Sequence, residues 1–407
     1  MGKSVAIIGY GTGGQAAALA LHQRGHDVTI FEKVANPGPV GAGFLLQPTG
    51  LQALWQLGLL DQVCRFGKPV HGLYGESTSG RVVMDMHYCE LDPRLHGVGL
   101  QRGALFGIFH DALHKLVALH PDHAIVALDV DAGRVQDHRG KWHGPFDLVV
   151  VADGSASQLR DAVTPFKVNK PYPWGAFWTL VDQGDWIAVN ALTQRYRNAR
   201  QMSGLLPVGT TAVDGKAKLS FFWSVPVDQM DAWQKGHSWL REFESLWPEA
   251  FDEFGSQLAS SNMKRAMYRD AIPKQWFNGR AVLLGDSAHA MSPQLGQGVN
   301  MALVDAVTLA DKLDVCSNLT DAFAAYARDR SKHLAAYHRF SRWLTPLFQS
   351  DHDKLSVARD WLFNPLGKMP IGKGNTLRVL TGTQQGWLGR YKLDERFIET
   401  FDRIFSQ

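Results

Sequence analysis

The chain has 407 residues, of which 45% are hydrophobic and 20% are charged, so it holds enough apolar material for a packed core and is not disordered as a whole. Its formal net charge of +3 is too small for a nucleic-acid partner, and a small ligand is the better expectation. Three widely spaced cysteines, and no apolar run of about 18 residues, predict a cytoplasmic protein without a disulfide framework, a metal site or an integral membrane segment.

The N-terminus has the pattern of a strand–helix–strand unit. Short buried strands are predicted over 4–9 and 27–31, and a helix is predicted over 13–24. A GxGxxG motif begins at Gly9, between the first strand and the helix. Its glycines allow a tight turn, a close approach of the backbone to a pyrophosphate and close helix–strand packing. Because the free N–H groups at a helix N-terminus attract phosphates, the pattern predicts a dinucleotide site.

An acidic residue ends the second predicted strand. Glu32 stands 21 residues after Gly11, close to the spacing of about 20 that is typical of a carboxylate accepting ribose hydroxyls. The same carboxylate would repel the 2′-phosphate of NADP, so the ligand expected at this site is FAD or NAD. Lys33 adds a positive charge that helps the phosphates only weakly.

The remaining elements alternate between strands and helices. After a loop rich in glycine and proline near 37–43, the periodicity predicts helices over 49–57 and 102–119, and strand-like stretches over 71–89, 125–128, 134–138 and 148–151. Aromatic strands of an antiparallel sheet are expected over 174–181, 202–208 and 218–225. A short buried strand is expected over 281–284, and helices over 299–313 and 320–344.

The six aromatic residues of two of these strands alternate. We expect half of them in the core and half lining a pocket for a flat ligand, and the six are Trp174, Phe177, Trp178, Phe221, Phe222 and Trp223.

Two further motifs follow short buried strands. Val149–Val151 runs into Asp153-Gly154, with Arg160 a few residues on. The second motif begins with Gly285-Asp286 and continues through Pro293, a glycine-rich turn and Asn300 to Asp305. At these residues the chain resembles the flavin-dependent aromatic hydroxylases of the p-hydroxybenzoate hydroxylase fold, and the three motifs stand in the order of that family.

The resemblance implies an α/β fold with a Rossmann-like FAD-binding domain built from discontinuous segments. That domain would comprise residues 1–70, 95–165 and 270–330. An inserted antiparallel β-sheet substrate domain would comprise 71–94 and 166–269, and a helical C-terminal region would comprise 331–407.

The resemblance also implies roles for single residues. Asp286 would bind the ribityl hydroxyls of noncovalent FAD, and Asp153 would lie where FAD and NAD(P)H both pass. Pro293 would stand at the edge of the reaction cavity, and backbone N–H groups from Gly296 and Gly298 onward would face the flavin, so these three residues are the catalytic candidates without an acid–base side chain. The full set of expected cofactor contacts is Gly9, Gly11, Thr12, Gly13, Gly14, Glu32, Lys33, Gly43, Arg102, Asp153, Gly285, Asp286, Gly298, Val299 and Asn300.

Other readings of some residues remain open. Arg102 could be an ordinary cation at a helix start, and Asp153 could simply form an Asp-Gly turn. His289 is expected to be structural rather than an acid or base. His110 and His114 imitate a zinc-protease motif on the predicted helix, but with no third ligand in view a metal is not expected.

The motifs alone do not choose the flavin reaction. Only one GxGxxG follows a strand, so NAD(P)H has no Rossmann domain of its own. The resemblance implies a monooxygenase in which NADPH or NADH, as a transient co-substrate, reduces FAD and O₂ then forms a flavin C4a-hydroperoxide that hydroxylates a small aromatic ring. The alternatives are a flavin oxidase or dehydrogenase acting on a small cyclic substrate, and a non-catalytic flavin sensor or scaffold. A monomer or homodimer is expected.

Overall fold

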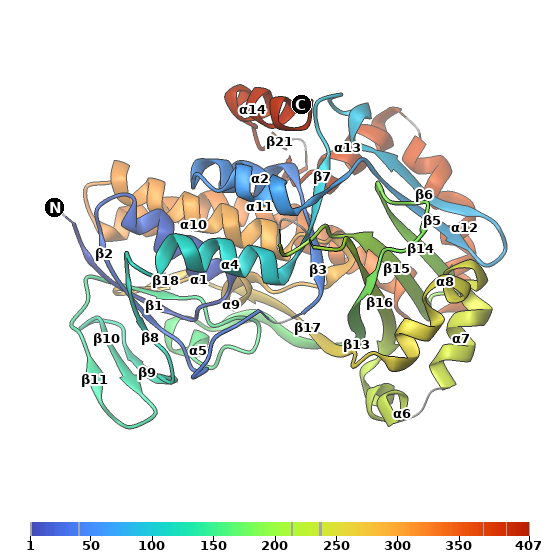
Figure 1. The fold of residues 1–407 in the computed structure, drawn as a ribbon. Helices are drawn as coiled ribbons and strands as arrows, with labels where there is room; N and C mark the ends of the chain where they lie inside the picture. Colours follow the sequence, from blue (N-terminus) through green and yellow to red (C-terminus); the bar gives the residue numbers. More distant parts are fainter. Residues whose placement is uncertain are drawn as a thin grey trace.

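The computed structural model describes residues 2–39, 41–212, 215–235, 238–368, 370–387 and 389–406. Figure 1 shows two regions side by side: an α/β region that contains the N-terminus, and a region in which a large sheet is covered by helices. The long helix α11 (Leu319–Phe348) belongs to both regions, because Phe323 and Tyr326 near its start lie in the core of the first and Phe348 at its end packs in the second.

A six-stranded sheet forms the centre of the α/β region. Its order is β18-β19-β12-β1-β2-β8, and β1 pairs in parallel with both β2 and β12. Helices α1, α4 and α10 lie together over this sheet (Figure 1). The elements are β1 (Ser4–Ile8), α1 (Thr12–His22), β2 (Asp27–Phe31), α4 (Arg102–Leu113), β8 (Ala118–His120), β12 (Leu148–Val151), β18 (Phe277–Asn278), β19 (Ala281–Leu283) and α10 (Gly298–Val315).

The predicted N-terminal unit is confirmed, but the helix predicted over 102–119 is too long. The helix ends at Leu113, and Ala118–His120 forms the edge strand β8, which pairs in parallel with β2. The apolar spacing continues through this segment, so periodicity does not reveal the break. Without β8, the edge of β2 would have unpaired N–H and C=O groups, which can pair with any neighbouring extended segment. Only the tertiary structure places residues 118–120 beside this edge.

A seven-stranded sheet forms the second region, in the order β17-β13-β16-β15-β14-β5-β6. The three predicted aromatic strands are confirmed within β13, β15 and β16. The sheet is antiparallel except for one parallel pair, β5 with β14, which joins the early hairpin to the later strands. The strands are β5 (Gly72–Ser77), β6 (Val82–His87), β13 (Phe166–Asp182), β14 (Ala191–Arg197), β15 (Gln201–Pro207), β16 (Lys218–Pro226) and β17 (Lys264–Pro273).

Both faces of this sheet are covered. Phe221 and Trp223 pack with Phe243 in one core, beneath the helices of residues 230–260. On the opposite face Phe222 packs in another core with Phe348 at the end of α11. Five of the six aromatic residues expected to alternate between core and pocket are therefore buried, and Trp178 is half-buried. Alternation specified the two faces of the sheet, but it does not show that helices cover both of them.

The other elements connect or cover these sheets. The remaining strands are β3 (Gly43–Leu46), β4 (Lys68–Val70), β7 (Gly97–Gln101), β9 (Ile125–Asp129), β10 (Arg134–Asp137), β11 (Trp142–His143), β20 (Gln384–Gln385) and β21 (Gly389–Arg390). The remaining helices are α2 (Pro48–Gln56), α3 (Leu60–Phe66), α5 (Arg160–Val163), α6 (Met230–Lys235), α7 (Ser238–Leu246), α8 (Pro248–Ser260), α9 (Asp286–His289), α12 (Asp353–Lys368), α13 (Pro370–Leu380) and α14 (Glu395–Phe405). Short 3₁₀ turns occupy Tyr88–Glu90, Val227–Gln229 and Pro293–Leu295. Among the described helices, none combines the length and the apolar character that crossing a membrane requires.

Candidate active site

The three sequence motifs meet at one edge of the six-stranded sheet. The register aligns Ile8 of β1 with Phe31 of β2 and with Val151 of β12, and Val151 in turn with Leu283 of β19. The loops that leave these four parallel strands therefore emerge together. In α/β sheets this carboxyl edge is where ligands bind.

The glycine-rich turn after β1 has the shape that the motif predicts. Gly9 has a φ of 105°, and a Cβ there would stand 2.5 Å from the Ala152 carbonyl oxygen. A Cβ on Gly14 would stand 2.0 Å from the Gly9 carbonyl oxygen, so helix and strand approach too closely for any side chain. Gly11, in contrast, faces open space and caps α1 without a side-chain hydrogen bond, which leaves the N–H groups at the start of this helix free. Thr12 and Gly13 form its first turn, with Gly13 against Leu284.

Glu32 lies beside this turn, in a more structural setting than the sequence indicates. Its Oε2 accepts the backbone N–H of Tyr10 at 2.7 Å, and its Oε1 accepts that of Val34 at 2.9 Å. The carboxylate is buried and joins the two loops, although each oxygen keeps a lone pair for a ribose hydroxyl. Lys33 is exposed.

Asp153 follows β12 and faces the same edge. Its Oδ1 is buried without a hydrogen-bond partner among the described residues, and burial raises the pKa of this carboxyl, against the opposing effect of Ser157. Arg160 holds the loop in place, because it is almost completely buried and donates to the carbonyl oxygens of Gly154 and Ser157, both at 3.1 Å. An unpaired buried carboxyl oxygen at a strand end is a group prepared for a polar ligand.

The loop after β19 brings Asp286 beside the start of α10. A Cβ on Gly298 would stand 3.7 Å from the Asp286 Oδ1, and the Asp286 side chain is exposed. Helix α10 begins without a side-chain cap, so its first N–H groups, including that of the half-buried Val299, are free. Pro293 is half-buried and Gly296 is exposed in a left-handed turn with a φ of 60°.

Asn300 has a different use from its neighbours. Its side chain is fully buried, where Oδ1 accepts the Gln47 N–H at 2.8 Å and Nδ2 donates to the Leu45 carbonyl at 3.1 Å. The amide therefore attaches α10 to the end of β3, and only the backbone of Asn300 is available to a ligand.

Arg102 approaches the site from the start of α4. Its backbone N–H donates to the Ala42 carbonyl at 3.0 Å, and its guanidinium lies 5.3 Å from the centre of the Phe44 ring. Burial lowers the pKa of the guanidinium, while Asp286 and Tyr268 act in the opposite direction. The described residues give this guanidinium no hydrogen bond or ion pair, so it is an unpaired cation facing the site. Gly43 is buried, and a Cβ at this position would stand only 2.5 Å from the Val208 Cγ1.

Sequence reasoning missed Tyr268 of β17. Its hydroxyl oxygen accepts the indole N–H of Trp178 at 3.1 Å, and burial raises its pKa to about 12. The phenol therefore stays protonated and retains a donor near Arg102. Nothing in its sequence context distinguishes it from other tyrosines.

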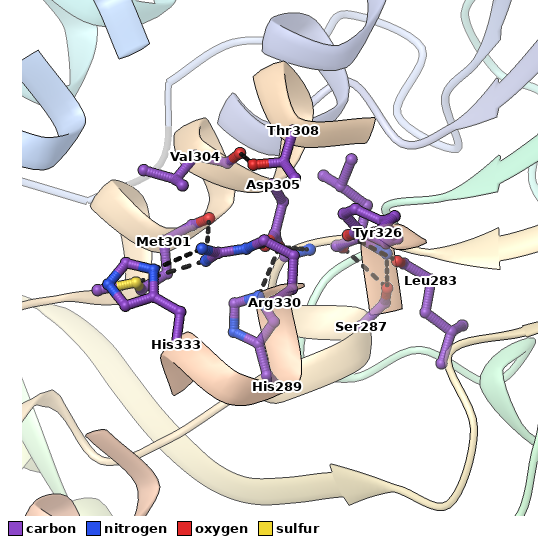
Figure 2. Close-up of polar contacts among 12 residues, drawn as sticks. Leu283, Ser287, His289, Met301, Val304, Asp305, Thr308, Tyr326, Arg330 and His333 are labelled. Carbon is purple, nitrogen blue, oxygen red and sulfur yellow. Dashed lines mark hydrogen bonds and ion pairs between the residues drawn. The ribbon is translucent and has the colours of Figure 1, made fainter. Parts of the chain in front are cut away.

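Sequence reasoning also missed a buried polar network beneath the Gly285–Asp286 loop, shown in Figure 2. Asp305 of α10 is completely buried, and its Oδ2 accepts the backbone N–H of Gly285 at 2.9 Å and Nε2–H of His289 at 2.5 Å. Its Oδ1 accepts Nε–H of Arg330, on α11, at 2.5 Å. Burial by itself raises the pKa of Asp305, but His289 and Arg330 outweigh it and hold that pKa at about 2.

The same network extends to the C-terminal segment. Arg330 also donates to Nδ1 of His333 at 2.6 Å, and His333 Nε2–H donates to the carbonyl of Gly382 at 2.7 Å. Burial lowers the pKa of His333 to about 3, and the charge of Arg330 acts in the same direction. His289 is thus in a structural position, as the sequence predicts. The network holds the loop that carries Asp286 in place, and its members come from three distant parts of the chain: α10, α11 and the C-terminal segment at Gly382.

Buried neutral histidines make stability depend on pH. Burial lowers the pKa of His333 to about 3 and that of His96 to about 4, whereas both would titrate near 6.5 in the unfolded chain. Below pH 6.5 the unfolded state binds more protons than the native state, so the native state loses stability as pH falls. We expect the denaturant midpoint to fall between pH 7 and pH 5, with a slope in unfolding free energy of up to about 1.4 kcal/mol per pH unit for each histidine. Equal midpoints at the two pH values would contradict this.

Together the described groups fit FAD. A pyrophosphate-binding turn, a carboxylate beside it, an exposed carboxylate, an unpaired guanidinium and two free helix N-termini lie along one edge. Within the part of the chain that the structure describes, no group of three or more His, Cys, Asp or Glu side chains is placed to hold a metal ion.

Comparisons with known proteins show the family and the fold. Residues 3–341 match the model of a family described as an FAD binding domain. The chain is 29% identical over 385 residues to hispidin-3-hydroxylase of Neonothopanus nambi, covering 82% of this chain and 87% of that protein. It is 28% identical over 338 residues to an FAD-dependent urate hydroxylase of Klebsiella oxytoca, covering 80% and 85%. The crystal structure of Klebsiella pneumoniae HpxO with FAD and uric acid has the same fold, with a TM-score of 0.78, 23% identity and coverage of 95% and 98%.

Proposed function

The chain belongs to the FAD binding domain family, and from this premise we propose that the edge described above holds noncovalent FAD for the hydroxylation of a small aromatic or heteroaromatic ring with NAD(P)H and O₂. The observation that carries the proposal is the convergence, at one edge of the sheet, of polar groups that the described residues leave without a hydrogen bond. These are the α1 and α10 N-termini, the Oδ1 of Asp153, the Asp286 carboxylate and the Arg102 guanidinium. When bound, FAD supplies electron transfer from NAD(P)H and the activation of O₂.

Each group has a role that follows from its position. The N–H groups that open α1 would bind the diphosphate, and Glu32 would accept ribose hydroxyls. Asp286 would accept the ribityl hydroxyls. The first N–H groups of α10, at Gly298 and Val299, would stabilise negative charge on the flavin edge by about 0.3–1 kcal/mol or more.

The substrate side would be built from the second region. Trp178 and Tyr268 meet near Arg102, where their flat rings can hold an aromatic substrate and keep water away. Because the Tyr268 phenol stays protonated, it would donate a hydrogen bond and would not act as a base. Pro293 and Gly296 would border this space through their backbone.

The domain division is part of the same proposal. The strands of the six-stranded sheet fall within 1–70, 95–165 and 270–330, which we assign to FAD binding, and the helical region 331–407 follows them. The seven-stranded sheet lies in 71–94 and 166–269, except that β17 continues across residue 269. We also propose a monomer or homodimer in the cytoplasm, where the three free cysteines would stay reduced.

The test separates the proposal from the alternative flavin reactions. We expect the purified protein to be yellow, to release FAD on denaturation, and to be bleached by NAD(P)H without oxygen, faster when a true substrate is present. One oxygen atom from labelled O₂ should then appear in the product, as measured by mass spectrometry. Bleaching by the substrate without any nicotinamide would indicate an oxidase, and no turnover with a broad panel of phenols and heteroaromatic rings would favour a sensor.

A further inference from the structure

A basic cleft lies outside the site described above. It has a volume of about 840 Å³, which is within the usual range for ligand sites, and it runs between α11 and the segment of β17 and β18. Its lining includes Lys167, Lys274, Arg328 and Arg339 but no Asp or Glu. The cleft therefore concentrates positive charge in a concave surface, where field lines focus and anions accumulate.

Most of these cations are not neutralised by the protein. Lys167 and Lys274 have no ion pair with any described residue, and Arg328 has only a contact at 3.5 Å with its exposed neighbour Asp329. The Arg339 guanidinium stacks on the Trp387 ring, 4.1 Å from its centre.

Two more basic side chains of the cleft do have a partner. His338 and Arg342 both face Asp270, at 3.7 and 2.7 Å. The carboxylate of Asp270 is thus already engaged by these two groups. The other four cations keep their hydrogen-bond donors available to an anion, apart from the contact of Arg328 with Asp329.

The wall of the cleft connects, through intervening side chains, to the two loops proposed to bind the flavin. Trp276 in its wall packs 5.7 Å, between ring centres, from His289, which ends the short helix that Asp286 begins. Lys167 follows Phe166, and the Phe166 ring lies 5.3 Å from the guanidinium of Arg160, which holds the Asp153 loop. A molecule in the cleft would therefore be linked through Trp276 and Phe166 to the segments proposed to position FAD.

We propose that this cleft binds the adenosine-phosphate half of NADPH, an inference that rests on the proposed function. The chain has no second Rossmann motif, so the reductant needs another basic surface. Glu32 repels a 2′-phosphate at the first motif, whereas Arg328 and Arg339 stand eleven residues apart on α11, about 16 Å along the helix, and can engage separate phosphate groups. The indole of Trp343, exposed at one end of the cleft, offers a flat face for adenine. A 2′-phosphate adds a charge of about −1.5 to −2, so NADPH is preferred to NADH.

The test is calorimetric titration of the FAD-loaded enzyme with NADP⁺ and NAD⁺, which requires no turnover. We expect NADP⁺ to bind at least about tenfold more tightly than NAD⁺. The double variant Lys167→Glu/Lys274→Glu should lose at least about tenfold in NADP⁺ affinity with unchanged FAD content, and the loss should shrink as salt rises. Lys332→Glu is the control, because Lys332 is an exposed lysine on α11 that does not line the cleft.

Equal affinities for NADP⁺ and NAD⁺ would overturn the inference, and so would an unchanged NADP⁺ affinity in the double variant. It would also be overturned if inorganic pyrophosphate bound as tightly as NADP⁺, because the cleft would then be a general anion site. Failure of the proposed function looks different. If the proposed function is wrong, labelled oxygen is absent from the product even though NADP⁺ binds. If only the cleft assignment is wrong, hydroxylation is intact, and the double variant is as active as the wild type at low NADPH concentration.

Discussion

Asp305→Ala is expected to lower the free energy of unfolding by about 3–5 kcal/mol. The change leaves Arg330 as a buried charge without its carboxylate and removes the acceptor for the Gly285 N–H. Denaturant titration of the flavin-free protein measures the loss. FAD affinity should fall as well, because the loop that carries Asp286 loses its attachment.

Two matched variants identify the cause. Asp311→Ala, on the same helix, breaks the exposed ion pair with Arg24 and should cost less than about 1 kcal/mol. Replacing both buried charges, in Asp305→Leu/Arg330→Met, should recover a large part of the loss, since no unpaired charge remains. If Asp305→Ala is as stable as the wild type, the network does not support the loop.

Asp286→Ala is expected to weaken FAD binding by about tenfold to a hundredfold, which corresponds to about 1.5–3 kcal/mol for a lost charged acceptor. Its side chain is exposed and faces the start of α10, so the flavin-free protein should keep its thermal midpoint. Quenching of flavin fluorescence during titration with FAD gives the affinity.

His289→Ala is the informative comparison for this second expectation. His289 is buried against Asp305 and does not face the site. Its loss should therefore lower the free energy of unfolding more than it lowers the free energy of FAD binding. The FAD affinity is measured at a temperature where the variant stays folded. Equal FAD affinity in Asp286→Ala and the wild type would remove the role proposed for Asp286.

The sequence by itself determined the elements whose signals are local. Gly9 and Gly11 lie between a strand and a helix as predicted, and Gly14 lies in the first turn of that helix, because turn, close packing and helix start are all specified within about ten residues. The family resemblance extended the prediction of a cofactor site to the Asp153 and Gly285–Asp286 loops. Parallel pairing of short buried strands then places these loops at one edge, since the carboxyl ends of parallel strands point the same way.

The tertiary structure decided the partners of polar groups and the covering of faces. Asp305 meets Arg330 because α10 packs against α11, and His333 meets Gly382 because the C-terminal segment packs against α11. No spacing in the sequence encodes these contacts between distant elements. The same holds for Tyr268 and Trp178, which are 90 residues apart and belong to different strands. Periodicity records which side of an element is apolar, but only packing decides what lies against that side. For this reason the glycine motifs could be read from the chain alone, whereas the network that holds their loops in place could not.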